Sequence, residues 1–302
     1  MSISTTMDSP AALKSSRKTT WRGGLMGTDY LWAFAFLIPY IAVFLAFVIY
    51  PVTYGLWLGS SPASYRALFA DPVYPEAVIN TLIYLGVAVN VKMFLALILS
   101  GFFMRKGWWV KALLLVFILP WAVPGIPSMI SIHWMLNGQW GLVNNTIWDI
   151  AHVDGPPWLD QSTLALSSVI YAHVWKWLPF WTIILLAGRM AIPRELYEAA
   201  DVDGATTLGR FTNVTWPLMV SLYTVCTLLS TIWLLGDFNA VHFISGGGPA
   251  LSTHVLATLG IRDAFELGDP RMGMACVISA LPVLIPLVVI LMRKMSKGEV
   301  QL

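Results

Sequence analysis

The sequence has few charged residues for its length. Of its 302 residues, 11% are charged and 57% are hydrophobic, and the mean hydropathy is +0.71. These values exclude an ordinary soluble globular protein, in which about 25% of residues are charged. Six long apolar stretches leave no polar segment large enough for a separate soluble domain. The composition therefore predicts one domain embedded in a membrane, and the net charge of +2 gives no sign of a nucleic-acid partner.

Other absences narrow the function. The only two cysteines, Cys226 and Cys276, lie within apolar stretches, so no disulfide framework is expected. No G-x-x-x-x-G-K-[ST] segment occurs, so we expect this chain to bind no ATP and no other cofactor itself. The five histidines lack metal-ligand spacing and are interpreted as lone structural residues. The apolar stretches also lack paired carboxylates or a nucleophile–base pattern, which argues against a membrane-embedded enzyme.

The apolar stretches predict six membrane-spanning helices, each close to the ~20 residues that cross the hydrocarbon core. The first is longer than the roughly 7–15 apolar residues of a signal peptide, so we expect it to remain as an anchor. Pro120, Pro124 and Pro127 interrupt the third, which should be broken and face protein or a water-filled path, or else carry a simple kink. The predicted spans are 31–50, 78–103, 110–136, 162–188, 214–236 and 272–292.

The basic residues predict the orientation. Thirteen of the 18 Lys and Arg residues lie in the N-terminal arm and in the segments 105–111, 189–210 and 293–297, whereas the opposite loops hold three. The positive-inside rule places the richer side, with both termini, in the cytoplasm. The predicted organisation is a disordered cytoplasmic arm (1–30), a transmembrane domain (31–293) that includes a cytoplasmic loop (189–213), and a cytoplasmic tail (294–302).

The cytoplasmic loop contains the segment IPRELYEAADVDG, residues 192–204. Pro193 suits the first turn of a helix and Gly204 suits its end, so a short helix of roughly 16 Å is expected outside the bilayer. The small Ala199 and Ala200 would let another protein approach closely. Charge-assisted contacts with a partner are available from Glu198, Asp201 and Asp203. The alternative, a helix resting on lipid headgroups, is disfavoured because these carboxylates would face anionic lipid.

Several segments together resemble the sugar-type permeases of ABC importers. Glu198-Ala199-Ala200, with Gly204 and Pro217, matches the Glu-Ala-Ala pattern in the cytoplasmic loop of that family. The other matching segments are NTLIY from Asn80, WMLNGQWGLVN from Trp134, VWKWLPF from Val174 and GGGP from Gly246. Together they cover about residues 36–295. The resemblance implies an all-α polytopic membrane protein with six transmembrane helices and the type I ABC importer permease fold.

The resemblance also implies the partners. The chain would be one permease subunit of a binding-protein-dependent importer for a sugar or polyol, in the bacterial inner membrane. It would pair with a second permease subunit, with two ATP-binding subunits that use ATP and magnesium, and with a periplasmic or lipid-anchored solute-binding protein. The cytoplasmic helix would couple the ATPase to the membrane helices. The residues implied in coupling are Glu198, Ala199, Ala200, Asp201, Asp203 and Gly204.

The two basic residues not counted above, Lys92 and Lys176, lie within predicted spans, and Asp237 directly follows the fifth span. The two charges of interest for a solute pathway are Lys176 and Asp237. A charge at mid-membrane costs about 2.5–3.5 kcal/mol on insertion, so both are expected to face water or a partner. Maltose-type relatives imply a solute pathway here, with aromatic rings stacking on the sugar. The implied pathway residues are Lys176, Trp177, Phe180, Ser230, Trp233 and Asp237. The alternative is that the rings only pack and that Lys176 pairs with Asp237.

A different class of function also fits six spans. The chain could be a self-sufficient secondary transporter or channel. Such carriers often show internal repeats and interrupted helices in both halves. Here no repeat is visible and only the third span is plainly interrupted, which favours the permease interpretation.

Overall fold

The structure, a computed structural model, describes residues 27–299, and every regular element in that range is a helix. The predicted all-α class is therefore confirmed. Most of the predicted N-terminal arm, residues 1–26, lies outside the described residues, as do residues 300–302 of the predicted tail. By its contacts the chain divides into two compact units, residues 1–53 and residues 54–302.

The described part of the first unit is one apolar helix. It consists of α1 (Gly27–Phe44), the π-helical segment η1 (Leu45–Ile49) and the first residues of α2 (Tyr50–Leu58). The apolar helix ends at Leu58 rather than near residue 50, and none of its most apolar 18-residue stretch is buried by protein. An exposed apolar surface of this length fits contact with lipid acyl chains.

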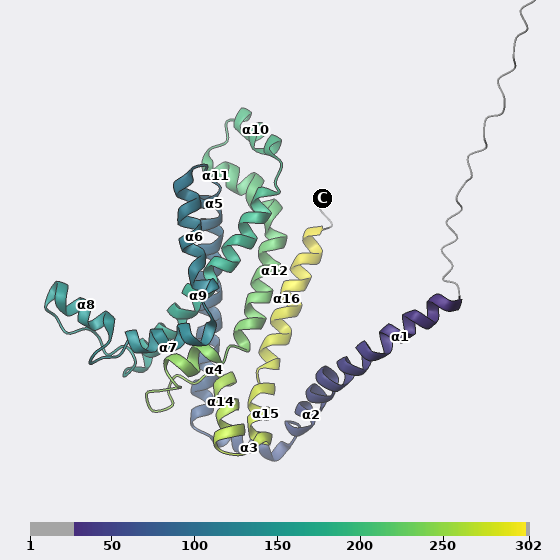
Figure 1. Cartoon of the computed structure of the whole chain (residues 1–302), viewed down its shortest axis with the longest axis vertical. Coiled ribbons are helices and arrows are strands. Elements are labelled where there is room, and N and C mark those ends of the chain that lie inside the picture. Colours follow the sequence, from purple (N-terminus) through teal and green to yellow (C-terminus); the bar gives the residue numbers. More distant parts are fainter. Residues whose placement is uncertain (1–26, 300–302) are drawn as a thin grey trace, which may run out of the picture. The chain divides into compact units, whose positions relative to one another are not determined.

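Three further long apolar helices belong to the second unit (Figure 1). They cover residues Val73–Phe103, Ser162–Met190 and Thr207–Leu235, which confirms the second, fourth and fifth predicted spans. The first of them is built from α4 (Val73–Tyr84), η2 (Leu85–Val89) and α5 (Asn90–Phe103). The second is α9 (Ser162–Met190). The third is built from α11 (Thr207–Arg210), η3 (Phe211–Thr215) and α12 (Trp216–Leu235).

The core of the second unit lies between α5 and α9. Ala96 on α5 and Ala172 on α9 are both fully buried, and side chains this small let two helices approach closely. Met93 and Leu185, also fully buried, fill the space on either side. Because helices in lipid gain little from hydrophobic association, close van der Waals packing of this kind holds them together.

The third predicted span is broken, as expected. It consists of α6 (Trp108–Ala122) and α7 (Gly125–Met135), which meet at an angle of 94°. Pro124 and Pro127 have no N–H group, so the carbonyls four residues earlier, of Pro120 and Val123, lose their helical donors. Lys176 of α9 replaces both donors: its Nζ donates to the Pro120 oxygen at 2.8 Å and also to the Val123 oxygen. The buried Lys176 side chain thus seals the break, in the sense that it supplies hydrogen-bond donors to both carbonyls.

This contact corrects the alternative in which Lys176 pairs with Asp237. The ammonium group of Lys176 binds the two carbonyls, and Asp237 binds other side chains. The spacing of residues along α9 could not predict this partner of Lys176, because the two carbonyls belong to the main chain of the third span.

The sixth predicted span, 272–292, is divided. The structure has α15 (Pro270–Ile278) and α16 (Leu281–Glu299), separated at Ser279 and Ala280. Within residues 27–299, four helices are long and apolar enough to cross a membrane, or five if the bent pair counts as one span. The number six therefore stays a prediction. Since α16 continues to Glu299, residues 294–299 of the predicted tail are helical.

Short helices connect the long ones. The outer loops predicted from the sequence contain α3 (Pro62–Ala70), α8 (Leu142–Ala151), α13 (Asn239–Ile244), α14 (Leu256–Ile261) and the π-helical segment η4 (Arg262–Glu266). Helices α14 and α15 cross closely because each has a glycine where they meet, Gly260 on α14 and Gly273 on α15. A Cβ atom added to Gly273 would lie 2.4 Å from the Gly260 carbonyl oxygen.

One buried carboxylate in these outer segments has no hydrogen-bond donor among the described residues. Asp263 of η4 is fully buried, and its nearest cation, the Arg262 guanidinium, lies 3.8 Å from Oδ1. Burial raises the pKa of Asp263 from 3.8 to about 6, against the smaller lowering effect of Arg262. The folded protein therefore binds a proton at Asp263 more tightly than the unfolded chain does.

We expect Lys176→Met to destabilise the protein. It would leave two carbonyls of a membrane-spanning segment without a donor, at about 1–3 kcal/mol each if no water reaches them. Thermal unfolding in detergent should show a lower Tm for Lys176→Met, with a smaller loss for Lys176→Arg, which keeps donors. Lys111→Met, on the exposed side of α6, is the matched control. An equal Tm for the Lys176→Met and Lys111→Met variants would contradict the role of Lys176 in sealing the break.

We expect Asp263→Asn to stabilise the protein at alkaline pH. Because the folded pKa is about 6 and the usual value is 3.8, stability falls as the pH rises through this window and stays low above it. The amide cannot ionise, so at pH 8 the variant should unfold a few degrees higher, since each kcal/mol shifts Tm by about 2–4 °C. At pH 4 the gain should vanish. The same gain at both pH values would rule out the buried charge as its cause.

Candidate functional site

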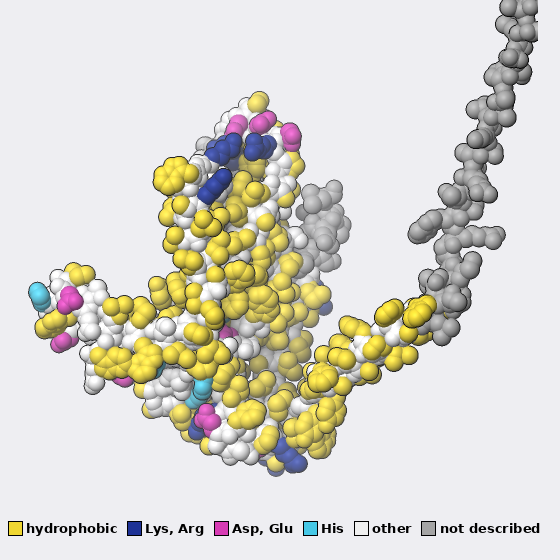
Figure 2. All heavy atoms as spheres, in the orientation of Figure 1, with side chains coloured by type: hydrophobic (Ala, Val, Ile, Leu, Met, Phe, Trp, Pro, Cys, Tyr) yellow, Lys and Arg dark blue, Asp and Glu magenta, His cyan; other side chains and the backbone are white. Residues whose placement is uncertain are grey.

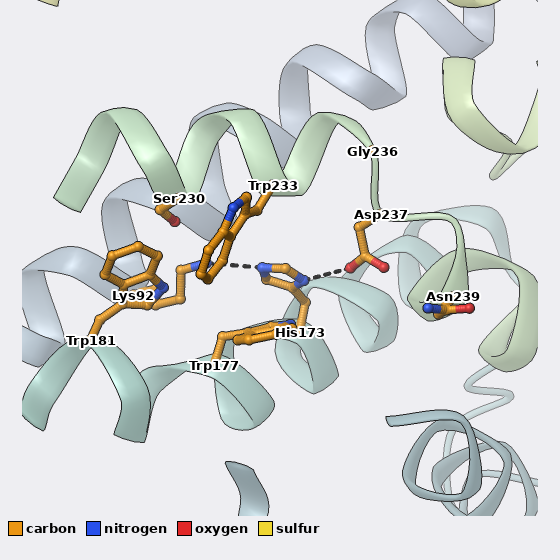
Figure 3. Close-up of a pocket in the computed structure, with 9 residues that line it drawn as sticks. All are labelled: Lys92, His173, Trp177, Trp181, Ser230, Trp233, Gly236, Asp237 and Asn239. Carbon is orange, nitrogen blue, oxygen red and sulfur yellow. Dashed lines mark hydrogen bonds and ion pairs between the residues drawn. The ribbon is translucent and has the colours of Figure 1, made fainter. Parts of the chain in front are cut away.

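A cavity of about 190 Å³ lies between three of the long helices of the second unit (Figure 3). Its walls come from α5, α9 and α12 and from the turn that follows α12. The lining residues are Lys92, His173, Trp177, Trp181, Ser230, Trp233, Gly236, Asp237 and Asn239.

Helix periodicity explains how these side chains come together. His173 and Trp177 are four residues apart on α9, and Ser230 and Trp233 are three apart on α12, so each pair shares one face of its helix. Lys92 is the third residue of α5, directly after the π-helical segment η2. Segments of π-helix are frequent at functional sites.

A chain of hydrogen bonds crosses the cavity. Asp237 Oδ2 accepts from His173 Nδ1 at 2.7 Å and from the Tyr84 hydroxyl at 3.1 Å, and His173 Nε2 lies 2.9 Å from Lys92 Nζ. Because a carboxylate only accepts, the His173 proton sits on Nδ1, which leaves Nε2 to accept from the lysine. A neutral imidazole thus connects a buried cation to a buried anion. The dashed lines in Figure 3 follow this chain.

The cavity retains unused hydrogen-bonding capacity. Among the described residues Lys92 Nζ has one hydrogen-bond partner, although an ammonium group carries three N–H donors. Ser230 is 1% exposed and its hydroxyl has no partner among the described residues. By contrast, Asp237 accepts three bonds, including one from the Ala240 N–H. The groups that remain free in the cavity are therefore mainly donors.

Aromatic rings form the other wall. The Trp233 ring lies 5.8 Å from Trp177, 5.6 Å from Phe180 and 5.5 Å from Trp181, measured between centroids. Trp181 is almost fully buried, whereas Trp233 is about half exposed and presents ring surface beside the cavity. Phe180 also stacks on Trp121, at the end of α6. The aromatic wall is thereby joined to the broken span.

The structure brings four of the six predicted pathway residues to the cavity wall: Trp177, Ser230, Trp233 and Asp237. Phe180 supports the rings from behind, and Lys176 points to the broken span.

Sequence reasoning missed Lys92 and His173. Lys92 was visible as a charge within an apolar stretch, and His173 stands one helical turn before Trp177. His173 is not a lone residue: its Nδ1 donates to Asp237 and its Nε2 accepts from Lys92.

The predicted cytoplasmic helix is present. It is α10 (Arg194–Val202), with Pro193 directly before it and Gly204 just after it at a φ of +73°. Of the six residues implied in coupling, five are exposed and Ala200 is half-buried. Two contacts fix α10 to the neighbouring helix: the Tyr197 hydroxyl to Thr215 Oγ1 at 2.9 Å, and Asp201 Oδ1 to Arg210 Nη1 at 3.0 Å. Asp201 therefore stabilises the loop through Arg210, and it is also exposed on the surface of α10.

Two segments that carry the family resemblance are in contact. The Asn80 amide donates to the carbonyl of Ser252 at 2.8 Å and to that of His254 at 3.1 Å, so NTLIY holds the loop after GGGP. In that loop Gly247 has a φ of +78°, and a Cβ there would lie 2.3 Å from the His254 ring. Only glycine fits this position.

Comparison with known proteins places this architecture in a family. A family model described as binding-protein-dependent transport system inner membrane component matches residues 92–297. The match covers more than half of the chain. The chain belongs to this family. It is accordingly a permease, the inner membrane component of a binding-protein-dependent transport system.

The permease is similar to several sugar-transport permeases. It is 32% identical to the trehalose/maltose transport system permease protein MalF of Thermococcus litoralis, over 79% of this chain and 85% of that one. It is 31% identical to the sulfoquinovosyl glycerol transport system permease protein SmoG of Agrobacterium fabrum, over 78% and 81%. It is 30% identical to the lactose transport system permease protein LacF of Rhizobium radiobacter, over 79% and 85%.

A solved structure has the same fold. One chain of a bacterial ABC transporter involved in the import of the acidic polysaccharide alginate superposes on the permease with a TM-score of 0.76 at 23% identity. The superposition covers 89% of the permease and 96% of that chain. The predicted ABC importer permease fold is confirmed.

We expect Asp237→Asn to destabilise the permease, because it leaves the Lys92 charge uncompensated. Breaking one side of a buried pair costs about 3–5 kcal/mol. The double variant Lys92→Met/Asp237→Asn removes both charges and should unfold at a higher temperature than the sum of the single effects implies. A double-mutant cycle of thermal unfolding measures this coupling. Strict additivity would show that His173 does not connect the two groups.

Proposed function

We propose that the permease forms half of the translocation pathway of an ATP-driven, binding-protein-dependent importer for a sugar or sugar-like solute. The observation that carries the proposal is the cavity beside Trp177, Ser230 and Trp233, where ring faces and unused hydrogen-bond donors stand together. Ring faces stack on the apolar faces of sugars, and donors such as Ser230 and Lys92 bind their hydroxyl oxygens. The names of the similar permeases, for trehalose, maltose and lactose, support the same solute class.

The size of the cavity supports a second permease subunit. Ligand sites usually have volumes of about 300–1,000 Å³, and this cavity has about 190 Å³. A second subunit facing α9 and α12 would supply the remaining wall. The half-exposed Trp233 ring would then lie at the interface between the two subunits.

Energy would come from partner subunits. The exposed acidic and small residues from Glu198 to Gly204, on α10 and in the turn after it, suit a groove on one of two ATP-binding subunits, which use ATP and magnesium. The second permease subunit would dock on the other. The Tyr197–Thr215 and Asp201–Arg210 contacts would transmit movement of α10 to η3 and α12, and so to the wall of the cavity. A periplasmic or lipid-anchored binding protein would deliver the solute from outside. We propose accordingly that the permease lies in a bacterial inner membrane with both termini in the cytoplasm, as the distribution of basic residues predicts.

The test is transport in proteoliposomes that hold the permease alone, or the permease with the second permease subunit, the ATP-binding subunits and the solute-binding protein. We expect uptake of radiolabelled maltose, trehalose or lactose only in the complete assembly and only with ATP. Gradient-driven uptake by the permease alone would instead establish a secondary transporter.

Variants of the permease separate the two parts of the mechanism. Trp233→Ala should lower uptake about ten-fold or more while ATP hydrolysis continues, whereas Glu198→Lys should lower both by placing like charge against a basic groove. Trp148→Ala and Asp149→Lys make the same changes on exposed positions of α8 and serve as controls. Normal uptake by Trp233→Ala across a range of solute concentrations would exclude the cavity from the pathway.

A further inference from the structure

A second and larger cavity, of about 670 Å³, lies at the other end of the long helices. It is an open cavity bordered by the end of α5, the end of α9, and α10, α11 and η3, so it adjoins the cytoplasmic loop and not the Trp233 cavity. Figure 2 shows Lys and Arg side chains gathered at this end of the unit, directly inside the acidic side chains of α10. This cavity shares no lining residue with the Trp233 cavity.

The cavity carries an excess of positive charge. Arg105, Arg189 and Arg210 line it, and none of its lining residues is acidic. Arg210 is paired with Asp201, but within residues 27–299 neither Arg105 nor Arg189 has a carboxylate partner. Two guanidinium charges therefore remain uncompensated beside the same space.

Arg189 in particular lacks acceptors. Its Nη2 donates to the Leu97 carbonyl at 3.1 Å, which holds the side chain against α5. Its Nε is buried and has no partner among the described residues, and Nη1 has none either. A guanidinium group has five N–H donors in a planar fork that matches the oxygens of a phosphate. A half-buried arginine with one acceptor is thus ready to bind an anion.

The remaining lining is of two kinds. The hydroxyls of Tyr197 and Thr207 stand near the arginines, whereas Met104 and Phe211 supply apolar surface. A cavity with a cationic, hydrogen-bonding part and an apolar part matches a molecule that carries both a phosphate and hydrocarbon. Basic pockets between transmembrane helices on the cytoplasmic side bind anionic lipid headgroups in this way.

We propose that this cavity binds a phosphate group, carried by an anionic phospholipid of the inner leaflet. The phosphate lies between Arg105 and Arg189, and the glycerol and acyl chains extend past Met104 and Phe211. Because Tyr197 of α10 and Thr207 of α11 also line the cavity, a bound lipid contacts the segment that leads into α12. The site uses none of the residues that line the Trp233 cavity, but it shares Tyr197, Arg210 and Thr215 with the proposed coupling contacts.

Calorimetric titration of the detergent-solubilised full-length chain tests the site. The probes are dihexanoyl phosphatidylglycerol, dihexanoyl phosphatidylcholine and inorganic phosphate. We expect the phosphatidylglycerol to bind most tightly. Arg105→Gln should weaken its binding about five-fold, since one basic residue near an anionic lipid contributes about a factor of that size. Lys106→Gln removes the same charge from the next, exposed residue, which does not line the cavity, and should leave binding within about two-fold.

The outcomes are distinct. Equal weakening by Arg105→Gln and Lys106→Gln, or equal binding of the two lipids, would overturn the site, as would the absence of binding by any probe. Tighter binding of inorganic phosphate than of phosphatidylglycerol, with the same sensitivity to Arg105→Gln, would support the phosphate group but overturn the lipid as its source. Arg189→Lys keeps the charge but loses the fork, and should weaken binding while leaving Tm unchanged. Unweakened binding by Arg189→Lys would exclude Arg189 from the site.

Discussion

Every main-chain polar group in a lipid environment must find its partner inside the protein, and this requirement organises the permease. Where helices are interrupted, a side chain from another helix replaces the missing donor. Lys176 does so for Pro120 and Val123, and Asn80 does so for the two carbonyls that follow the GGGP loop. The irregular segments are consequently also the places where distant parts of the sequence are joined.

The same requirement shapes the charged groups. The charges of Lys92 and Asp237 are tolerated inside the protein because His173 hydrogen-bonds to both side chains. The Tyr84 hydroxyl donates a further hydrogen bond to the Asp237 carboxylate. The arrangement leaves donors free on one side of the cavity and rings on the other. The uncharged, hydroxyl-rich solute proposed above would find both kinds of contact there without a counter-charge.

Much of the fold follows from the sequence, because apolar length and proline position are local signals. The spans at Val73–Phe103, Ser162–Met190 and Thr207–Leu235, the break near Pro124, and helix α10 were all predictable in this way. The division of the last span at Ser279 was missed, although Pro282 marks it: this proline stands in the first turn of α16 and removes the N–H donor for the Ile278 carbonyl. The hydrogen-bond partners of Lys176 and His173 were not predictable. They depend on which helices pack together, and no single segment of the sequence contains that information. Counting four residues back from Pro124 and Pro127 identifies the orphaned carbonyls, but not their donor.

The sealed break in the third span has a consequence for how this sequence can change over evolution. Replacing Pro127 by a residue with an N–H would let the helix satisfy the Val123 carbonyl itself, and the buried ammonium of Lys176 would lose an acceptor. Replacing Lys176 alone would instead leave the Pro120 and Val123 carbonyls without a donor. The two prolines and the lysine are therefore coupled positions, and substitutions at positions 124, 127 and 176 should covary among descendants of this chain.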